Sequence, residues 1–108
     1  MTKYKGIPVS DGIAHSKAVI INSIEDYKKV NHEAIIVVKK SYPGWIIPLM
    51  TASGIIVEIG GKYSHIGIVS REMGKPCVSD IPNICRIIHD GDEVIINGDT
   101  GEVDVVNR

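Results

Sequence analysis

The chain has 108 residues, of which 44% are hydrophobic, and its formal net charge is −1. This length predicts one compact domain over residues 1–108, burying roughly two-thirds of the surface of the unfolded chain. Its lysines and arginines are scattered, which argues against nucleic-acid binding. No stretch approaches the ~18 apolar residues of a membrane helix and no signal peptide is evident, so we expect a soluble cytoplasmic protein without membrane partners.

The first half of the chain is predicted to form a parallel sheet. A first strand is expected over Gly12–Ile21, and nearly continuous apolar runs at Glu33–Val38 and Gly54–Ile59 are typical of strands buried on both faces. Between the last two, SYPGWIIPLM (41–50) predicts a short helix that a serine can cap and a proline can start. Strand, helix and strand in this order predict a crossover between parallel strands.

The second half predicts a glycine turn and a second helix. The segment GGKYSHIGIVSREMG, Gly60–Gly74, places a glycine pair before a helix that ends at its last glycine. Helical spacing puts Ile66, Val69 and Met73 on one apolar stripe and Ser70 away from it. Further on, EVIINGDTGEVDVV (93–106) has two alternating runs around an Asn-Gly turn, which predicts an antiparallel hairpin.

These elements together predict an α/β fold with a parallel sheet, helices, and antiparallel strands from the two ends of the chain. Cys77 and Cys85 are eight residues apart, which fits neither a redox CxxC pair nor a zinc site, so both are expected to be small core residues.

His65 is the residue to which the sequence points most clearly. It falls in the first helical turn, where unpaired backbone amides and the positive end of the helix dipole stabilise an anion. A neutral imidazole is a nucleophile, so His65 can accept a phosphoryl group and carry it. Gly60, Gly61, Ser64 and the first-turn amides are the predicted phosphate cradle. From spacing alone, a histidine after a glycine turn is more often an exposed residue that starts the helix or a structural hydrogen-bond donor.

Other chemistries are not indicated. The chain has no GxGxxG dinucleotide motif, no Walker A loop and no GxSxG nucleophile elbow. The four histidines show neither HxH nor HxxxH spacing, so we predict no metal site in this chain.

The segment GGKYSHIGIVSREMGKPCV resembles the phosphohistidine motif of the mobile, or swivelling, domain of phosphoenolpyruvate-utilising enzymes. This family includes phosphoenolpyruvate synthase, pyruvate phosphate dikinase, enzyme I of the sugar phosphotransferase system and rifampicin phosphotransferase. The flanking segments YPGWIIPLMTASGIIVEIGG and HDGDEVIINGDTGEV are also similar, and GIPVSDGIAHSKAVII more loosely, so the resemblance covers almost the whole chain. The positions that match the motif are Gly60, Gly61, Ser64, His65, Arg71, Glu72, Gly74 and Pro76.

The resemblance implies a three-layer β/β/α fold with a parallel central sheet and additional antiparallel strands. It implies that His65 carries a phosphoryl group between a nucleotide-binding ATP-grasp domain and a phosphoenolpyruvate/pyruvate-binding barrel domain or another acceptor. The chain would then be one component of a phosphotransferase, binding no cofactor itself, with Mg²⁺ on the partner domains. Arg71 is predicted to steady the phosphate, although a helix arginine is often only a surface residue.

The sequence also departs from the family pattern. Tyr63 stands where many relatives have a threonine that plant-type dikinases phosphorylate for regulation, so that regulation is not expected. Gly67 replaces an alanine and should weaken the helix slightly. Two functions therefore remain: a phosphocarrier acting through His65, or a non-catalytic binding or regulatory module that keeps the fold.

Overall fold

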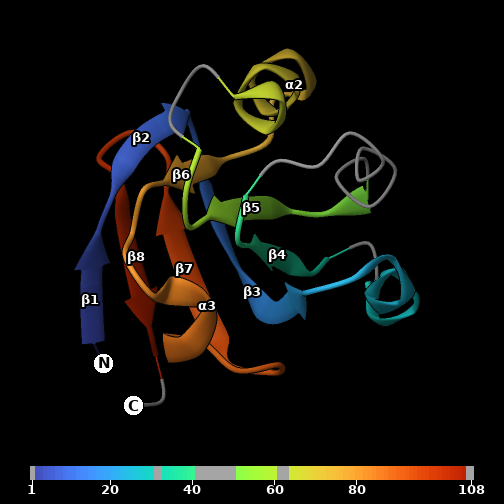
Figure 1. Ribbon diagram of the computed structural model, residues 1–108. Helices are drawn as coiled ribbons and strands as arrows, with labels where there is room; N and C mark the ends of the chain where they lie inside the picture. The colour runs from blue at the N-terminus through green and yellow to red at the C-terminus, as the bar shows by residue number, and fades with distance from the viewer. Residues whose placement is uncertain (1, 31–32, 41–50, 61–63, 107–108) are drawn as a thin grey trace.

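The computed structural model describes residues 2–30, 33–40, 51–60 and 64–106. Its elements are β1 (Thr2–Lys5), β2 (Ile7–Ser10), β3 (Ile13–Ile21), the 3₁₀ helix η1 (Ile24–Lys29), β4 (Ile35–Val38), β5 (Gly54–Val57), α2 (His65–Met73), β6 (Cys77–Ser79), α3 (Ile84–Ile87), β7 (Glu93–Asn97) and β8 (Glu102–Val105) (Figure 1). The three predicted strands and the hairpin are confirmed, with ends that differ by at most two residues. The helix predicted over 41–50 lies outside the described residues. Within the described part of the chain, no helix is long and apolar enough to cross a membrane.

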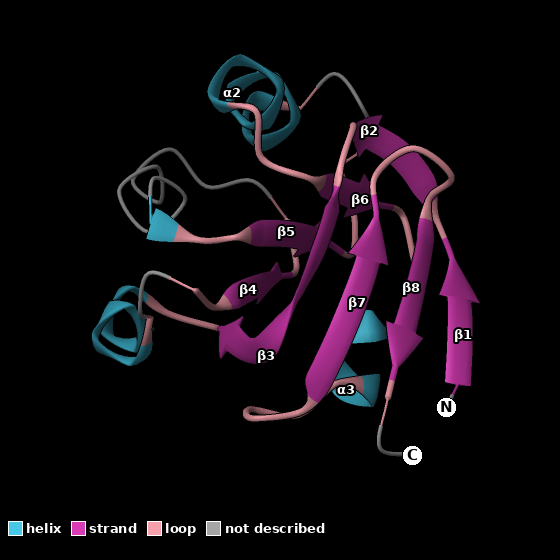
Figure 2. Cartoon of the chain, turned by 180° about the vertical axis from the view of Figure 1, so that it is seen from behind, coloured by secondary structure: helices cyan, strands magenta, loops and turns pink. Residues whose placement is uncertain are grey.

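The strands form one eight-stranded sheet in the order β1-β8-β7-β3-β4-β5-β6-β2. Strands β3 to β6 run parallel, and the pairings of β1, β8, β7 and β2 are antiparallel. Figure 2 shows β4, β5 and β6 lying across the upright strands β7, β8 and β1. The parallel strands end in register, because Ile21, Val38, Val57 and Ser79 pair in sequence across the sheet.

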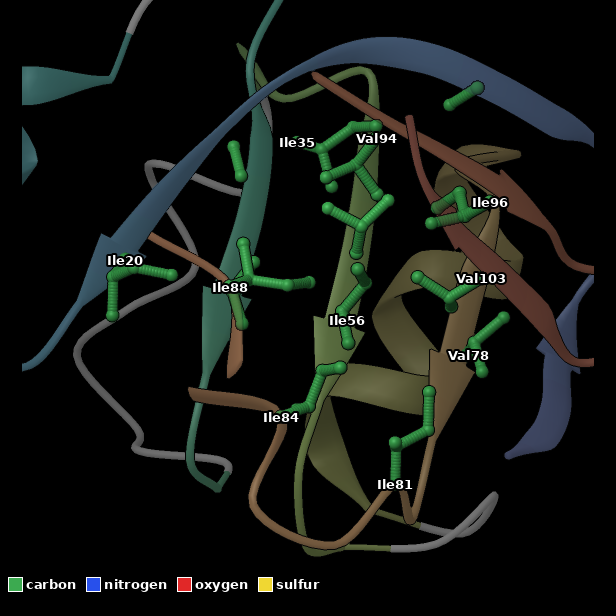
Figure 3. Close-up of a cluster of buried hydrophobic side chains, with 14 residues drawn as sticks. Ile20, Ile35, Ile56, Val78, Ile81, Ile84, Ile88, Val94, Ile96 and Val103 are labelled. Atoms are coloured by element: carbon green, nitrogen blue, oxygen red, sulfur yellow. The ribbon is translucent and has the colours of Figure 1, made fainter. Parts of the chain in front are cut away.

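Two apolar clusters produce the layers. The first lies between the antiparallel and parallel halves of the sheet and includes Ile88 and Ile84 next to strand residues (Figure 3). The second joins the other face of the parallel half to Ile66 of α2. The runs in β4 and β5 are buried throughout because neighbouring residues face different clusters, as Ile35 and Ile36 do. The predicted three-layer β/β/α fold is therefore confirmed.

The first nine described residues form the strands at both edges of the sheet. Strand β1 pairs with β8, whereas β2, only two residues further on, pairs with β6 at the opposite edge. Gly6 joins the two strands, and a Cβ there would lie 2.3 Å from the carbonyl oxygen of Ser79. Thr2 pairs with Val105, so the two ends of the described chain lie side by side (Figure 1).

Asp90 fastens the loop after α3 to η1 and β3. Its carboxylate accepts hydrogen bonds from the Ile20 amide at 2.6 Å and from Lys29 Nζ at 2.9 Å. Burial would raise the pKa of the Asp90 carboxyl, but these two hydrogen bonds outweigh it and hold the pKa below its usual value.

The two cysteines are free thiols. Cys77 is fully buried in the second cluster, and Cys85 is partly buried against the first. Burial raises the pKa of Cys77 to about 12, which suits the predicted role of a core residue.

Candidate functional site

Helix α2 begins at His65, beyond the carboxyl end of β5. The predicted helix is confirmed: it runs to Met73, and Gly74 ends it with a left-handed φ of 68°. The side chain of His65 is exposed at the first helical position. The segment that leads to His65 leaves the sheet at the carboxyl end of β5, the edge where open α/β folds commonly bind ligands.

Ser64 caps the amino terminus of α2. Its backbone is extended, and its Oγ accepts a hydrogen bond from the Gly67 amide at 3.1 Å. This cap fixes the direction in which the first helical turn begins. Since Oγ acts only as an acceptor in that hydrogen bond, the hydroxyl proton of Ser64 can still be donated to a ligand.

The buried face of α2 differs from the predicted stripe. Its buried residues are Ile66, Gly67 and Ser70, whereas Val69 and Met73 are only partly buried. The expectation that Ser70 points away from the core is therefore wrong. The small residues Gly67 and Ser70 face the protein and allow the helix to approach closely, so that size rather than hydrophobicity decides which side chains are covered.

Arg71 lies near the carboxyl end of the same helix and connects it to β2. Its Nη1 donates a hydrogen bond of 3.2 Å to the carbonyl oxygen of Val9 in β2. Arg71 lies six positions after His65, which is about 9 Å along the helix axis. The predicted phosphate-binding role of Arg71 remains a prediction, and its contact in this structure is with β2.

Gly60, after the end of β5, is attached to Asp80, the residue that follows β6. The Gly60 amide donates to Asp80 Oδ1 at 3.2 Å, so this amide of the predicted cradle already has a partner. Gly61 lies outside the described residues. The sequence analysis did not identify Asp80. The signal that could have found it is a polar residue directly after β6: since β5 and β6 end side by side, such a residue lies close to the segment that leads to His65.

A hollow of about 370 Å³ lies beyond the carboxyl ends of β5 and β6 and is lined by Glu58, Ile59, Asp80, Pro82 and Asn83. Glu58 Oε1 accepts a hydrogen bond from the Cys85 amide at 3.0 Å. Burial and the Glu58 carboxylate together raise the pKa of Cys85 to about 12, so this thiol stays protonated at neutral pH. Among the described residues, no three His, Cys, Asp or Glu side chains are arranged to hold a metal ion.

Comparison with known proteins places this helix in a defined family. The family model "PEP-utilising enzyme, mobile domain" matches residues 30–101, which include β4, β5, α2 and the Ser64–His65 pair. The chain belongs to this family. It is 31% identical over 101 residues to rifampicin phosphotransferase of Bacillus cereus, and 35% identical over 99 residues to a probable phosphoenolpyruvate synthase of Methanothermobacter thermautotrophicus. These alignments cover 94% and 92% of the chain but only 12% and 14% of the two relatives, so the mobile domain corresponds to a small part of each.

Solved structures confirm the mobile-domain fold. A structure of enzyme I superposes with a TM-score of 0.64 and 24% identity, over 79% of this chain and 34% of that one. Aconitase X of Thermococcus kodakaraensis superposes with a TM-score of 0.73 and 16% identity, over 99% of this chain and all of the matched chain. At these identities the similarity shows the fold alone.

Proposed function

We propose that this mobile domain is a phosphocarrier that receives a phosphoryl group on His65 and passes it to an acceptor. The observation that carries the proposal is the exposed imidazole at the amino terminus of a capped helix, inside the region that matches the family. In the charging step, a neutral ring nitrogen bonds to the donor's phosphorus while the phosphorus–oxygen bond to ADP or to the enolate of pyruvate breaks. In the discharging step, the phosphorus–nitrogen bond breaks and the acceptor takes the phosphoryl group.

The helix terminus suits the charged intermediate. The amides and dipole at the start of α2 favour a negative group on His65, and the Ser64 hydroxyl is placed to donate to a phosphate oxygen. Gly61 remains part of the proposed cradle. Gly60 has a different role in this proposal. Its amide donates to Asp80, so it attaches the chain after β5 rather than binding phosphate.

The partners in this proposal are separate domains. Phosphoryl transfer requires in-line geometry and neutralisation of charge, usually by Mg²⁺ and by arginine or lysine side chains. We assign these to an ATP-grasp domain and to a phosphoenolpyruvate/pyruvate-binding barrel or other acceptor domain. The names of the relatives, a phosphoenolpyruvate synthase and a rifampicin phosphotransferase, support a donor and an acceptor of this kind.

A second function is a binding or regulatory module without turnover. The fold by itself does not decide between the two functions, since aconitase X has this fold under a name that does not refer to phosphoryl transfer. In a binding module His65 would be an ordinary exposed residue of the helix start.

Intact-mass spectrometry separates the two functions. The wild-type protein is incubated with Mg²⁺ and either ATP or phosphoenolpyruvate, together with a candidate partner domain, and is kept near neutral or alkaline pH because phosphohistidine is labile to acid. The carrier proposal expects one added phosphoryl mass that is lost in His65→Gln and kept in the control His89→Gln, whose histidine is also exposed. Equal labelling of wild type and His65→Gln, or no labelling by a partner shown to be active, would favour the binding module.

A further inference from the structure

We propose that Asp80 is a positioning residue that, by holding Gly60 at the start of the segment leading to His65, supports the placement of His65 needed for phosphoryl transfer. This inference rests on the proposed carrier function. Asp80 directly follows β6, and its amide donates to the carbonyl oxygen of Val57, the last residue of β5, at 2.9 Å. The residue is thereby fixed where β5 leaves the sheet toward the helix.

Both carboxylate oxygens of Asp80 are engaged. Oδ2 accepts a hydrogen bond from Ser79 Oγ at 3.0 Å, and Ser79 is itself buried. Oδ1 accepts from the Gly60 amide at 3.2 Å. The first contact sets the orientation of the carboxylate, and the second attaches Gly60 to it, five residues before His65. A hydrogen bond from an amide to an ionised acceptor is stronger than one between neutral groups.

The backbone of Asp80 shows that this placement has a cost. Its φ of 59° lies in the left-handed region, which is unfavourable for residues other than glycine, although aspartate and asparagine tolerate it better than most. Glycine would relieve the strain but would offer no acceptor to Gly60. A side chain therefore occupies a position where glycine would suit the backbone, and such conformations often occur at functional sites.

Two contacts lie on either side of helix α2 along the chain. Arg71 attaches the carboxyl-terminal part of the helix to Val9 of β2, and Gly60, five residues before His65, is attached to Asp80. Transfer rates depend steeply on the position of the reacting nitrogen, since a displacement of about 1 Å can cost a factor of about a hundred. If the second attachment is lost, His65 keeps its chemistry but samples more orientations.

The test compares three variants. Asp80→Gly removes the acceptor and relieves the strain, Asp80→Asn keeps an oxygen toward Gly60, and Asn83→Gly is the matched control. Asn83 is the other described residue with a left-handed non-glycine backbone, with a φ of 62°, and its side chain makes no capping hydrogen bond to α3.

Three quantities are measured: thermal stability, exchange of the Gly60 amide proton by NMR, and the rate of His65 labelling with the donor and partner that charge the wild type. Asp80→Gly should lower the labelling rate at saturating partner about tenfold and speed exchange at Gly60. The partner concentration at half-saturation should not change. Asp80→Asn should restore both the rate and the slow exchange, and Asn83→Gly should match wild type.

The inference is overturned if Asp80→Gly is labelled as fast as wild type, or if Asn83→Gly loses as much activity. If Asp80→Gly does not fold, Ser79→Ala replaces it, and unchanged exchange at Gly60 together with unchanged labelling in that variant would equally overturn the inference. If wild type itself is not labelled, the carrier proposal fails, whereas exchange at Gly60 still shows whether Asp80 holds that residue.

Discussion

Replacement of Ser64 separates its role in stability from its role in chemistry. In Ser64→Ala the Gly67 amide loses its 3.1 Å acceptor at the start of α2. Loss of a serine N-cap costs about 1 kcal/mol of unfolding free energy, within a range of roughly 0.5–2 kcal/mol. For a domain of this size that corresponds to a fall in melting temperature of roughly 4–8 °C.

Ser64→Asp is the informative comparison. Aspartate caps helices about as well as serine, and its charge interacts favourably with the helix amino terminus, so stability should return to the wild-type level. Its carboxylate has no proton to donate to a phosphate and repels a phosphoryl dianion on the adjacent residue. We therefore expect labelling of His65 to fall in both variants, although only Ser64→Ala is destabilised.

The assays are thermal and urea unfolding followed by circular dichroism, and His65 labelling followed by intact mass. Ser64→Thr, which keeps both the acceptor and the hydroxyl proton, is the control. Unchanged stability of Ser64→Ala would refute the capping argument. Wild-type labelling of Ser64→Asp would refute the argument that the start of α2 is an anion site.

Three further predictions concern other contacts. The variant Arg71→Met loses the hydrogen bond to β2, so its unfolding free energy should fall by about 0.5–1.5 kcal/mol. Labelling of His65 should stay unchanged. A large loss of labelling would instead support the predicted phosphate-binding role of Arg71. The variant Gly98→Ala should lower the unfolding free energy, measured by urea unfolding, by about 3 kcal/mol or more. The reason is that the added Cβ would lie 1.8 Å from the Ser10 carbonyl oxygen. An unchanged unfolding free energy would contradict the tight packing of the hairpin turn. Asp90 has a lowered pKa in the folded protein, so its contribution is present above the unfolded value of about 4 and disappears as pH falls through the folded value. Asp90→Asn should flatten this loss in acid unfolding curves, and a curve parallel to wild type would count against the proposed contacts.

Much of the fold follows from local sequence pattern. The strands β4 and β5 were predictable because runs such as EAIIVV have apolar residues at successive positions, which only burial on both faces explains. The limits of α2 were predictable because Ser64 and Gly74 favour the backbone geometries of helix ends. The first-turn position of His65 followed from those limits.

The supports of the site were not predictable from pattern. Asp80 contacts Gly60 across 20 residues, and Arg71 contacts Val9 across 62, so both depend on which strands become neighbours. The burial of Ser70 was missed for another reason. A hydrophobic stripe identifies apolar side chains, whereas close approach of a helix to a sheet selects small ones.

The pairing of Thr2 with Val105 has a mechanical consequence. Both ends of the described chain leave at one end of the body, and α2 lies at the other in both views (Figures 1 and 2). Segments attached to the two ends would therefore act together as a single pivot rather than as two separate anchors. A rotation of the domain about such a pivot would displace α2 more than the strands beside the two chain ends, because α2 lies at the opposite end of the body.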